Sequence, residues 1–344
     1  MVFGRGAVAH LGEEMNALGA KRALVLSTPA QAKQARGLAA VTGANVCGVF
    51  PEAAMHTPLG VTEKAMEQLG RTDADVVVSF GGGSTIGLGK AIVLRADLPH
   101  IAIPTTYAGS EATPILGETK GSEKTTIRDL RVLPSSIIYD PNLSDNLPPP
   151  MSVVSGLNAM AHAAEALYAR DRDPISTMMA LEGSRAFIEA LPSIAGEETD
   201  TFVRAAARER ALLGAWLCGT VLGRVGMALH HKLCHVLGGT FGLSHAETHA
   251  IVLPHAISFN ETAARDLLAP LAMALGADTA GKGLYDLAVG IGAPVSLAEI
   301  GFHADQIAEA VDATMRNQYW NPRDLTEDGL TALLSAAVDG RRPD

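Results

Sequence analysis

Short apolar runs alternate with amphipathic stretches through the first 140 residues of the chain. The apolar runs predict buried strands, and the stretches between them have the spacing of helices. Strands that alternate with helices are typical of βαβ units, so we expect a parallel sheet covered by helices. The predicted strands are 21–27, 44–50, 75–80, 100–103 and 135–139, and the predicted helices are 31–41, 61–70 and 86–96.

The pattern changes after a Pro-rich stretch at 147–150, where three successive prolines restrict the backbone and separate the elements on either side. Beyond it the apolar spacing is helical almost throughout. We therefore expect an α/β domain at 1–147 and an all-α domain at 148–344. The helices predicted in the second domain are 153–168, 175–191, 202–222, 229–237, 263–275, 283–291, 304–315 and 329–337.

Charge and composition restrict the classes of partner. The net charge of −10, without a basic block, argues against nucleic acid or an anionic membrane. An anionic small molecule would need a local basic pocket. The three cysteines show no CxxC spacing, and neither a signal peptide nor an apolar run of about 18 residues is present. These features favour a cytoplasmic enzyme.

A glycine-rich turn, Phe80 to Thr85, follows a predicted strand and opens a predicted helix. Its glycines let the backbone approach a ligand closely, and the helix N-terminus offers N–H groups to a pyrophosphate. We expect Gly82, Gly83 and Ser84 to bind a dinucleotide. A tight turn that merely needs small residues is the alternative.

A second polar turn, 104–111, follows the next predicted strand. Ligands of open α/β sheets bind outside the carboxyl ends of the strands. Thr105, Thr106 and Ser110 are therefore candidates for the rest of the dinucleotide. A loop capped by its own hydroxyl groups would have the same composition.

Six of the eleven histidines lie between residues 226 and 255. His231 and His235 are four residues apart, so on a helix they share one face, and His245 follows a Gly-rich break. Such crowding of metal-binding and proton-carrying groups indicates an active site. The alternative is a set of hydrogen-bonded helix histidines, which is the favoured interpretation for His230, His249 and His255 taken singly.

The motifs together resemble the iron-containing alcohol dehydrogenase superfamily. The residues that carry the resemblance are GGGS after a strand, PTT…GSE, a later DP, a helix with (D/N)AxxHxxE, and HxxxHxLG followed by a further His. The resemblance implies a Rossmann-like α/β domain and a helical domain in a dehydroquinate synthase-like architecture, with the active site in the cleft between them. It also implies a metal held by one Asp and three His, which fall here on Asn158, His162, His231 and His245.

Asn158 departs from the family pattern because a neutral amide replaces the carboxylate. Together with MHTP at 55–58 and GLNA at 156–159, it makes the chain resemble the maleylacetate reductase branch. That resemblance implies reduction of the C=C bond of maleylacetate, and of 2-chloromaleylacetate, to 3-oxoadipate during the breakdown of aromatic compounds. An amide is a poor ligand for a transition metal. We therefore expect an enzyme that requires no metal.

Roles follow from this resemblance and from the chemistry of an enolate intermediate. Hydride addition to the alkene places negative charge on the ketone oxygen, and hydrogen-bond donors would stabilise it. His231, His245 and His162 are candidates for that stabilisation, with Asn158 beside them. His235 either donates the proton or packs near the nicotinamide. The candidates for binding the dicarboxylate substrate are His56, Lys232 and Arg323.

The hydride donor is expected to be NADH, with NADPH left open. Thr28, after the first predicted strand, stands where the family often has an Asp that binds the adenosine ribose, so no acidic group repels a 2′-phosphate. Lys124 corresponds by its spacing to a family lysine near the cofactor. The resemblance also suggests a homodimer.

Three other interpretations predict different behaviour. A metal-dependent alcohol or aldehyde reductase of the same superfamily would turn over simple aldehydes. A nucleotide-binding protein without catalysis would bind NAD(H) without turnover. A metal-dependent polyol dehydrogenase is disfavoured by Asn158.

Overall fold

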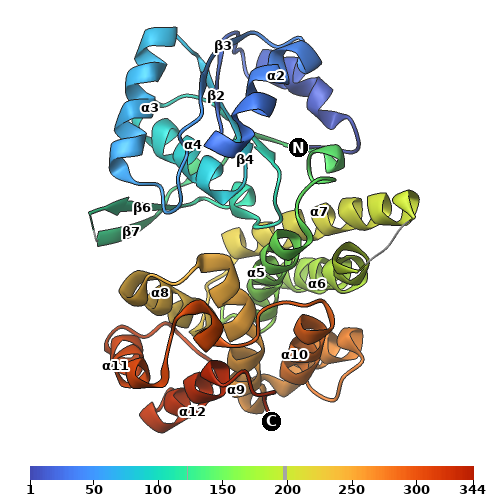
Figure 1. Ribbon diagram of the computed structural model, residues 1–344, viewed down its shortest axis with the longest axis vertical. Coiled ribbons are helices and arrows are strands. Elements are labelled where there is room, and N and C mark those ends of the chain that lie inside the picture. The colour runs from blue at the N-terminus through green and yellow to red at the C-terminus, as the bar shows by residue number, and fades with distance from the viewer. Residues whose placement is uncertain (122, 197–199) are drawn as a thin grey trace. The chain divides into compact units, whose positions relative to one another are not determined.

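The computed structural model describes residues 1–121, 123–196 and 200–344, and the side chains of 123 and 124 lie outside this description (Figure 1). The chain divides into two compact units, 1–147 and 148–344. The first unit is an α/β structure and the second is built from helices, so the predicted fold class is confirmed.

A six-stranded sheet in the order β1-β8-β5-β4-β2-β3 forms the centre of the first unit. All neighbouring strands are parallel. The strands are β1 (Val2–Phe3), β2 (Ala23–Leu26), β3 (Val46–Phe50), β4 (Val76–Gly81), β5 (His100–Pro104) and β8 (Ser136–Tyr139). β2 and β4 are buried along their whole length, as expected of strands covered on both faces.

Helices cover both faces of this sheet. The apolar side chains of α1 (Leu11–Ala17) and α2 (Ala32–Thr42) pack against one face. Those of α3 (Leu59–Thr72) and α4 (Gly83–Ala96) pack against the other. The polar hairpin β6 (Ile115–Lys120) and β7 (Glu123–Arg128) was not predicted, because most of its described residues are polar and show no buried alternating face.

The strand order reverses between β2 and β4. The chain passes from β2 outward to β3, returns to β4 beside β2, and then continues outward to β5 on the other side. The carboxyl ends of β2 and β4 therefore flank a topological switch point, the position where open α/β sheets bind their ligands. The predicted dinucleotide turns follow β4 and β5.

The second unit contains eight α-helices within its described residues. They are α5 (Pro149–Tyr168), α6 (Pro174–Ala195), α7 (Thr201–Arg224), α8 (Leu229–Phe241), α9 (His245–Leu275), α10 (Ala280–Gly290), α11 (Ile307–Arg316) and α12 (Glu327–Val338). The sequence pattern missed the first half of α9. That segment is buried almost all round, so it lacks the amphipathic period on which the prediction depends.

Helix α5 is the centre of this unit. It is buried along nearly its whole length and packs against α6, α7 and α9. Gly156 permits close packing, because a Cβ there would lie 2.9 Å from Leu191 and 3.1 Å from Phe187. A small side chain at this position lets the larger ones of α6 reach the α5 backbone.

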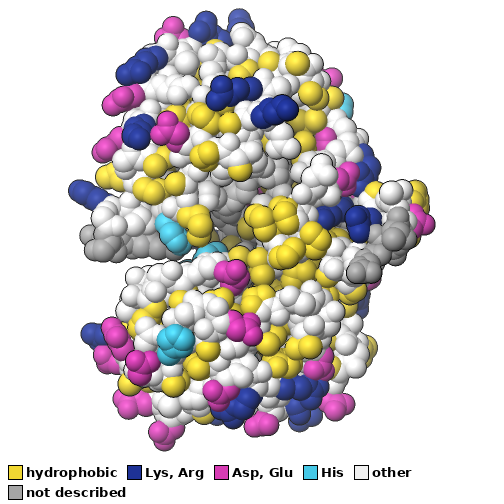
Figure 2. All heavy atoms as spheres, in the orientation of Figure 1, with side chains coloured by type: hydrophobic (Ala, Val, Ile, Leu, Met, Phe, Trp, Pro, Cys, Tyr) yellow, Lys and Arg dark blue, Asp and Glu magenta, His cyan; other side chains and the backbone are white. Residues whose placement is uncertain are grey.

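The surface and the helices give two further observations. Acidic and basic side chains are interspersed on the face that Figure 2 shows. Within the described residues, no single helix has the length and apolar character needed to cross a membrane. One pair, α7 with α8, meets that test on length and composition when taken together, but the two helices are bent by 95°.

Candidate functional site

The glycine turn of the first unit joins β4 directly to α4. Gly81 has φ 153°, and a Cβ there would lie 2.6 Å from Thr85 Oγ1. At Gly82 a Cβ would lie 2.9 Å from Thr106 Oγ1. Gly82 is the N-cap residue and offers no side chain to the first turn of α4, which contains Gly83 and Ser84. This end of the helix suits an anion that binds backbone N–H groups.

The neighbouring turns meet through a residue that the sequence analysis did not single out. Gln31 donates from Nε2 to Thr105 Oγ1 at 2.9 Å, and Thr28 Oγ1 donates to Gln31 Oε1 at 3.4 Å. Thr105 N also donates to Gly81 O. The structure thus brings Thr28, Thr105, Thr106 and Gly82 together at one edge of the sheet. Lys124 belongs to β7, and its side chain lies outside the described part of the structure.

Beneath these turns lie two buried titratable side chains, Lys90 and Glu111. Lys90 Nζ donates to Ser110 O, Thr113 O and Oγ1, and Ile115 O at 2.6–2.9 Å. Burial lowers the pKa of Lys90 to about 7, although the charge of Glu111 opposes this. Burial likewise raises the pKa of Glu111 to about 7, against the effect of hydrogen bonds from its own backbone and from Tyr139. A lysine among the apolar positions of a helix was the signal that could have revealed this pair.

Three polar residues share one buried face of α5 in the second unit. Asn158, His162 and Glu165 are spaced i, i+4 and i+7, and each is at most 4% exposed. The side-chain oxygen Asn158 Oδ1 is buried and has no hydrogen-bond partner among the described residues. Glu165 closes the (D/N)AxxHxxE motif, but the sequence analysis gave it no role.

His162 and His231 form a chain with Glu165. His162 Nδ1 lies 2.9 Å from His231 Nε2, and His231 Nδ1 lies 2.7 Å from Glu165 Oε2. Because a carboxylate only accepts hydrogen bonds, His231 donates from Nδ1 and keeps a lone pair on Nε2. His162 is then the donor in the bond between the two rings.

Further histidines surround this chain. The ring of His249 lies 5.2 Å from that of His231 and 4.2 Å from that of His245. His230 Nε2 and His249 Nδ1 are 3.0 Å apart. Burial, followed by the neighbouring histidines, holds the pKa values of His230 and His249 well below the ordinary value. His230 and His249, which sequence reasoning favoured as structural, therefore lie within the cluster as neutral rings, whereas His255 packs against Tyr285.

The other candidates have different surroundings. His235 is exposed on α8, and its Nδ1 lies 2.9 Å from the hydroxyl of Tyr319. Lys232 is buried, with its ammonium 5.8 Å from the centre of the Tyr319 ring, and burial lowers its pKa. Tyr319 thus links two candidates.

Arg323 and His56 lie elsewhere. Arg323 donates to Phe259 O at 2.8 Å and stacks on the Phe259 ring at 4.1 Å, which gives its side chain a structural contact. His56 belongs to the first unit, in the exposed loop between β3 and α3, with φ 62°. A positive φ is strained for a histidine, so this loop is held by its surroundings.

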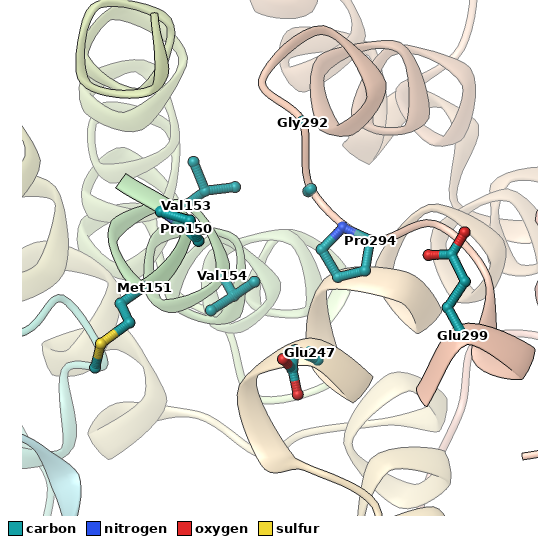
Figure 3. A pocket seen from close by; sticks show the side chains of 9 residues that line it. Pro150, Met151, Val153, Val154, Glu247, Gly292, Pro294 and Glu299 are labelled. Atoms are coloured by element: carbon teal, nitrogen blue, oxygen red, sulfur yellow. The ribbon is translucent and has the colours of Figure 1, made fainter. Parts of the chain in front are cut away.

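A pocket of about 400 Å³ opens on the second unit between α5 and the loop at 292–294 (Figure 3). Pro150, Val153 and Val154 form its apolar wall, and Glu247 and Glu299 also line it. Two carboxylates without a basic partner in the lining would repel an anionic substrate. The electrostatics of this pocket therefore do not suit a dicarboxylate.

Comparisons with known proteins cover the whole chain. The family model described as "Iron-containing alcohol dehydrogenase" matches residues 1–141, and the one described as "Fe-containing alcohol dehydrogenase family, C-terminal" matches residues 152–338. The chain is 56% identical over 344 residues to a maleylacetate reductase of Rhizobium sp. (strain MTP-10005), covering 100% of this chain and 97% of the relative. It is 51% identical over 343 residues to one of Burkholderia cepacia, with 100% and 96% covered. A crystal structure of maleylacetate reductase from Agrobacterium tumefaciens has a TM-score of 0.95 and 56% identity over 99% of this chain and 96% of that one.

These findings correct one expectation from the sequence. The prediction that no metal is required is wrong, because the matching family is iron-containing and a group of metal-binding side chains is present. Among the described residues, His230, Cys234 and His249 bring three ligand atoms within 4.8 Å of one another. The expectation rested on the missing carboxylate at position 158, which lowers the affinity that three imidazoles alone would give. His230, Cys234 and His249 were not expected to form a group of metal-binding side chains.

Proposed function

Because the chain belongs to the iron-containing alcohol dehydrogenase family, we propose that it is a maleylacetate reductase that uses NADH or NADPH. The observation that carries the proposal is the 56% identity to a maleylacetate reductase over the full chain. The buried histidine cluster supports it, because reduction of an enone needs groups that stabilise an oxyanion and deliver a proton.

We assign the binding of the dinucleotide to residues 1–147. The glycine turn at the switch point supports this assignment, since its backbone N–H groups suit a pyrophosphate. Thr28, Thr105 and Thr106 would bind the remaining polar groups of the dinucleotide. Ser110 and Lys124 stay candidates from the family resemblance. Catalysis is assigned to residues 148–344.

A divalent ion would be held by Asn158, His162, His231 and His245. The buried oxygen Asn158 Oδ1 without a partner fits such an ion, as does the Glu165 carboxylate behind His231. When bound, the ion would withdraw electron density from the ketone oxygen of the substrate.

The trio His230, Cys234 and His249 is the other group of suitable ligands. Its outer ring nitrogens, His230 Nδ1 and His249 Nε2, are buried and have no partner within the part of the chain that the structure describes. Ligand histidines in proteins almost always donate this second N–H group to a carboxylate, a carbonyl or water. We therefore favour the set that contains His231, whose second nitrogen has such a partner.

The proposed reaction begins with hydride transfer from the nicotinamide to C2, the alkene carbon β to the ketone. The electron pair of the C=C bond moves to form the enolate of C3, C4 and the ketone oxygen. His162, His231 and His245 would contribute to stabilising this oxygen by holding the ion, because a ring nitrogen that binds an ion has no proton to donate. A proton then adds to C3 and completes 3-oxoadipate. His235, hydrogen-bonded to Tyr319, is our candidate for supplying that proton.

The carboxylates of the substrate need cationic partners. Lys232 is the favoured residue, because its ammonium lies beside His235 and Tyr319 on the same side of α8. His56 remains a second candidate. Arg323 is the weaker one, since its guanidinium is bonded to Phe259.

The test is an assay of NADH oxidation by the iron- or zinc-loaded protein, with maleylacetate and with a simple aldehyde in parallel. We expect kcat/KM to be at least about 100-fold higher for maleylacetate. His231→Gln should lower kcat by about 100-fold or more, whereas His255→Gln, from the same segment but outside the cluster, should change it little. Turnover of aldehydes without turnover of maleylacetate would refute the proposal.

The cellular setting is also a proposal. Three cysteines without disulfides suit a reducing compartment such as the cytoplasm. The homodimer stays a prediction, which light scattering of the purified protein at several concentrations would test.

A further inference from the structure

Glu165 is a fully buried carboxylate at the centre of the histidine cluster. It lies on α5 at 0% exposure, three residues after His162. A buried carboxylate is stable only where several donors surround it. The donors around Glu165 therefore indicate what the residue holds in place.

Four donors reach this carboxylate, and three of them belong to the start of α8. Ala228 N donates at 2.8 Å, His230 N at 2.7 Å and His231 Nδ1 at 2.7 Å. The fourth donor is the hydroxyl of Tyr168 at 3.4 Å. Ala228 is the N-cap residue of α8 and has no side chain that could cap the helix. Glu165 supplies the missing cap from another helix and places a negative charge at the positive end of α8.

The bond from His231 sets the position of its proton. With Nδ1 donating to Glu165, the lone pair of His231 is on Nε2, which faces His162. Nε2 can then bind a cation. The opposite tautomer would place a proton where the ligand lone pair is needed.

We propose that Glu165 is a positioning residue that fixes His231 with its proton on Nδ1 and supplies the metal site with the negative charge that Asn158 lacks. The inference rests on the proposed function only in taking His231 as a ligand. Asn158 and three imidazoles form a neutral ligand set, so none of the ligands would carry a negative charge to balance a divalent ion. The Glu165 carboxylate lies one imidazole ring behind that set and partly compensates the charge.

Glu165→Gln tests this role while preserving the size of the side chain. The amide oxygen can still accept from the two donors of one carboxylate oxygen, but the NH2 group must face the two donors of the other. Relief comes if His231 moves its proton to Nε2 and accepts from the amide. We expect nitrogen-15 NMR of the metal-free variant to show this reversed tautomer. Competition with a chelator should show zinc affinity lowered about 10- to 100-fold.

Glu261→Gln is the matched control. Glu261 is also buried and caps a helix from another helix, because it accepts from Ala280 N at 2.8 Å and Gly281 N at 3.2 Å at the start of α10. Neither of these two hydrogen bonds involves a histidine. Its variant should lose stability to a similar extent and keep the zinc affinity of the unchanged protein within about twofold.

Equal losses of zinc affinity in both variants would show a merely structural role and overturn the proposal. Unchanged affinity and an unchanged tautomer in Glu165→Gln would do the same. If that variant does not fold, the unchanged protein still decides, since a proton on Nε2 of His231 contradicts the inference. Failure to reduce maleylacetate, with the zinc and tautomer results as expected, would remove the proposed function and leave the role of Glu165 intact.

Discussion

The two units hold candidate functional segments with buried charges of opposite sign. In the first unit, the Lys90 ammonium binds three carbonyl groups and a hydroxyl of the segment 110–115. In the second, the Glu165 carboxylate binds two backbone N–H groups and the His231 ring at the start of α8. The difference follows from what each segment exposes. An irregular loop turns carbonyl oxygens inward, whereas a helix start turns N–H groups inward.

A buried charged side chain can thus hydrogen-bond to backbone groups that secondary structure leaves unpaired, and so hold their segment in place. Each charged group serves several backbone partners at once, and the surface ion pairs of the chain do not. Exposed pairs contribute about 0–1 kcal/mol, whereas a buried group that leaves its partners unpaired costs several times more.

The largest effect on stability is expected when the charge of Lys90 is removed. Lys90→Met should lower the free energy of unfolding by about 3–5 kcal/mol, because several buried oxygens lose their donor. Urea unfolding followed by circular dichroism measures it. Arg95→Met on the same helix removes a partly exposed pair with Glu118 and should cost less than about 1 kcal/mol. Similar losses in the two variants would contradict the comparison.

A smaller effect is expected from pH. The raised pKa of Glu111 means that the folded chain keeps this proton longer than the unfolded chain. Its contribution to stability is therefore full below about pH 4.5 and is lost as the pH rises to about 7. Glu111→Gln has no such loss. Relative to the unchanged protein, it should gain about 1–3 kcal/mol in unfolding free energy between pH 5 and pH 7.5. A pH-independent difference between the two proteins would show that Glu111 does not titrate in this range.

The smallest effect is expected at the turn 104–111, in which the carbonyl of Ser110 accepts from Lys90. A Cβ at Gly82 would lie 2.9 Å from Thr106, so Gly82→Ala should displace that threonine and raise KM for NADH about tenfold. Steady-state kinetics with varied NADH measure the change. Gly37→Ala on α2, where a Cβ meets nothing within 4 Å, is the control and should leave KM unchanged. An unaltered KM in Gly82→Ala would place the dinucleotide elsewhere.

Periodicity predicted most of the fold, because it records which face of an element is buried. The predicted strands of the first unit correspond to β2, β3, β4, β5 and β8. The β6–β7 hairpin and the first half of α9 lack the expected alternation, the former being largely polar and the latter buried almost all round. Such segments carry no periodic signal.

The candidate site was predictable in its residue types but not in its contacts. The spacing of the motifs identified Asn158, His162 and His231, all of which lie in one cluster. The roles of Glu165 and His249 depend on distances between α5, α8 and α9, which no local pattern contains. The metal was misjudged for the same reason, since the motifs contain Glu165 and Cys234 but do not show which other side chains lie beside them.

The close contact at Gly156 limits how the second unit can be altered. The side chains of Leu191 and Phe187 on α6 lie against the α5 backbone at Gly156, so a larger residue there must displace these side chains or shift the helix. Asn158 and His162 would move with it, because both project from the same rigid rod. Attempts to widen the range of substrates should therefore change residues near His235 and Tyr319. The contact between α5 and α6 should be left unchanged.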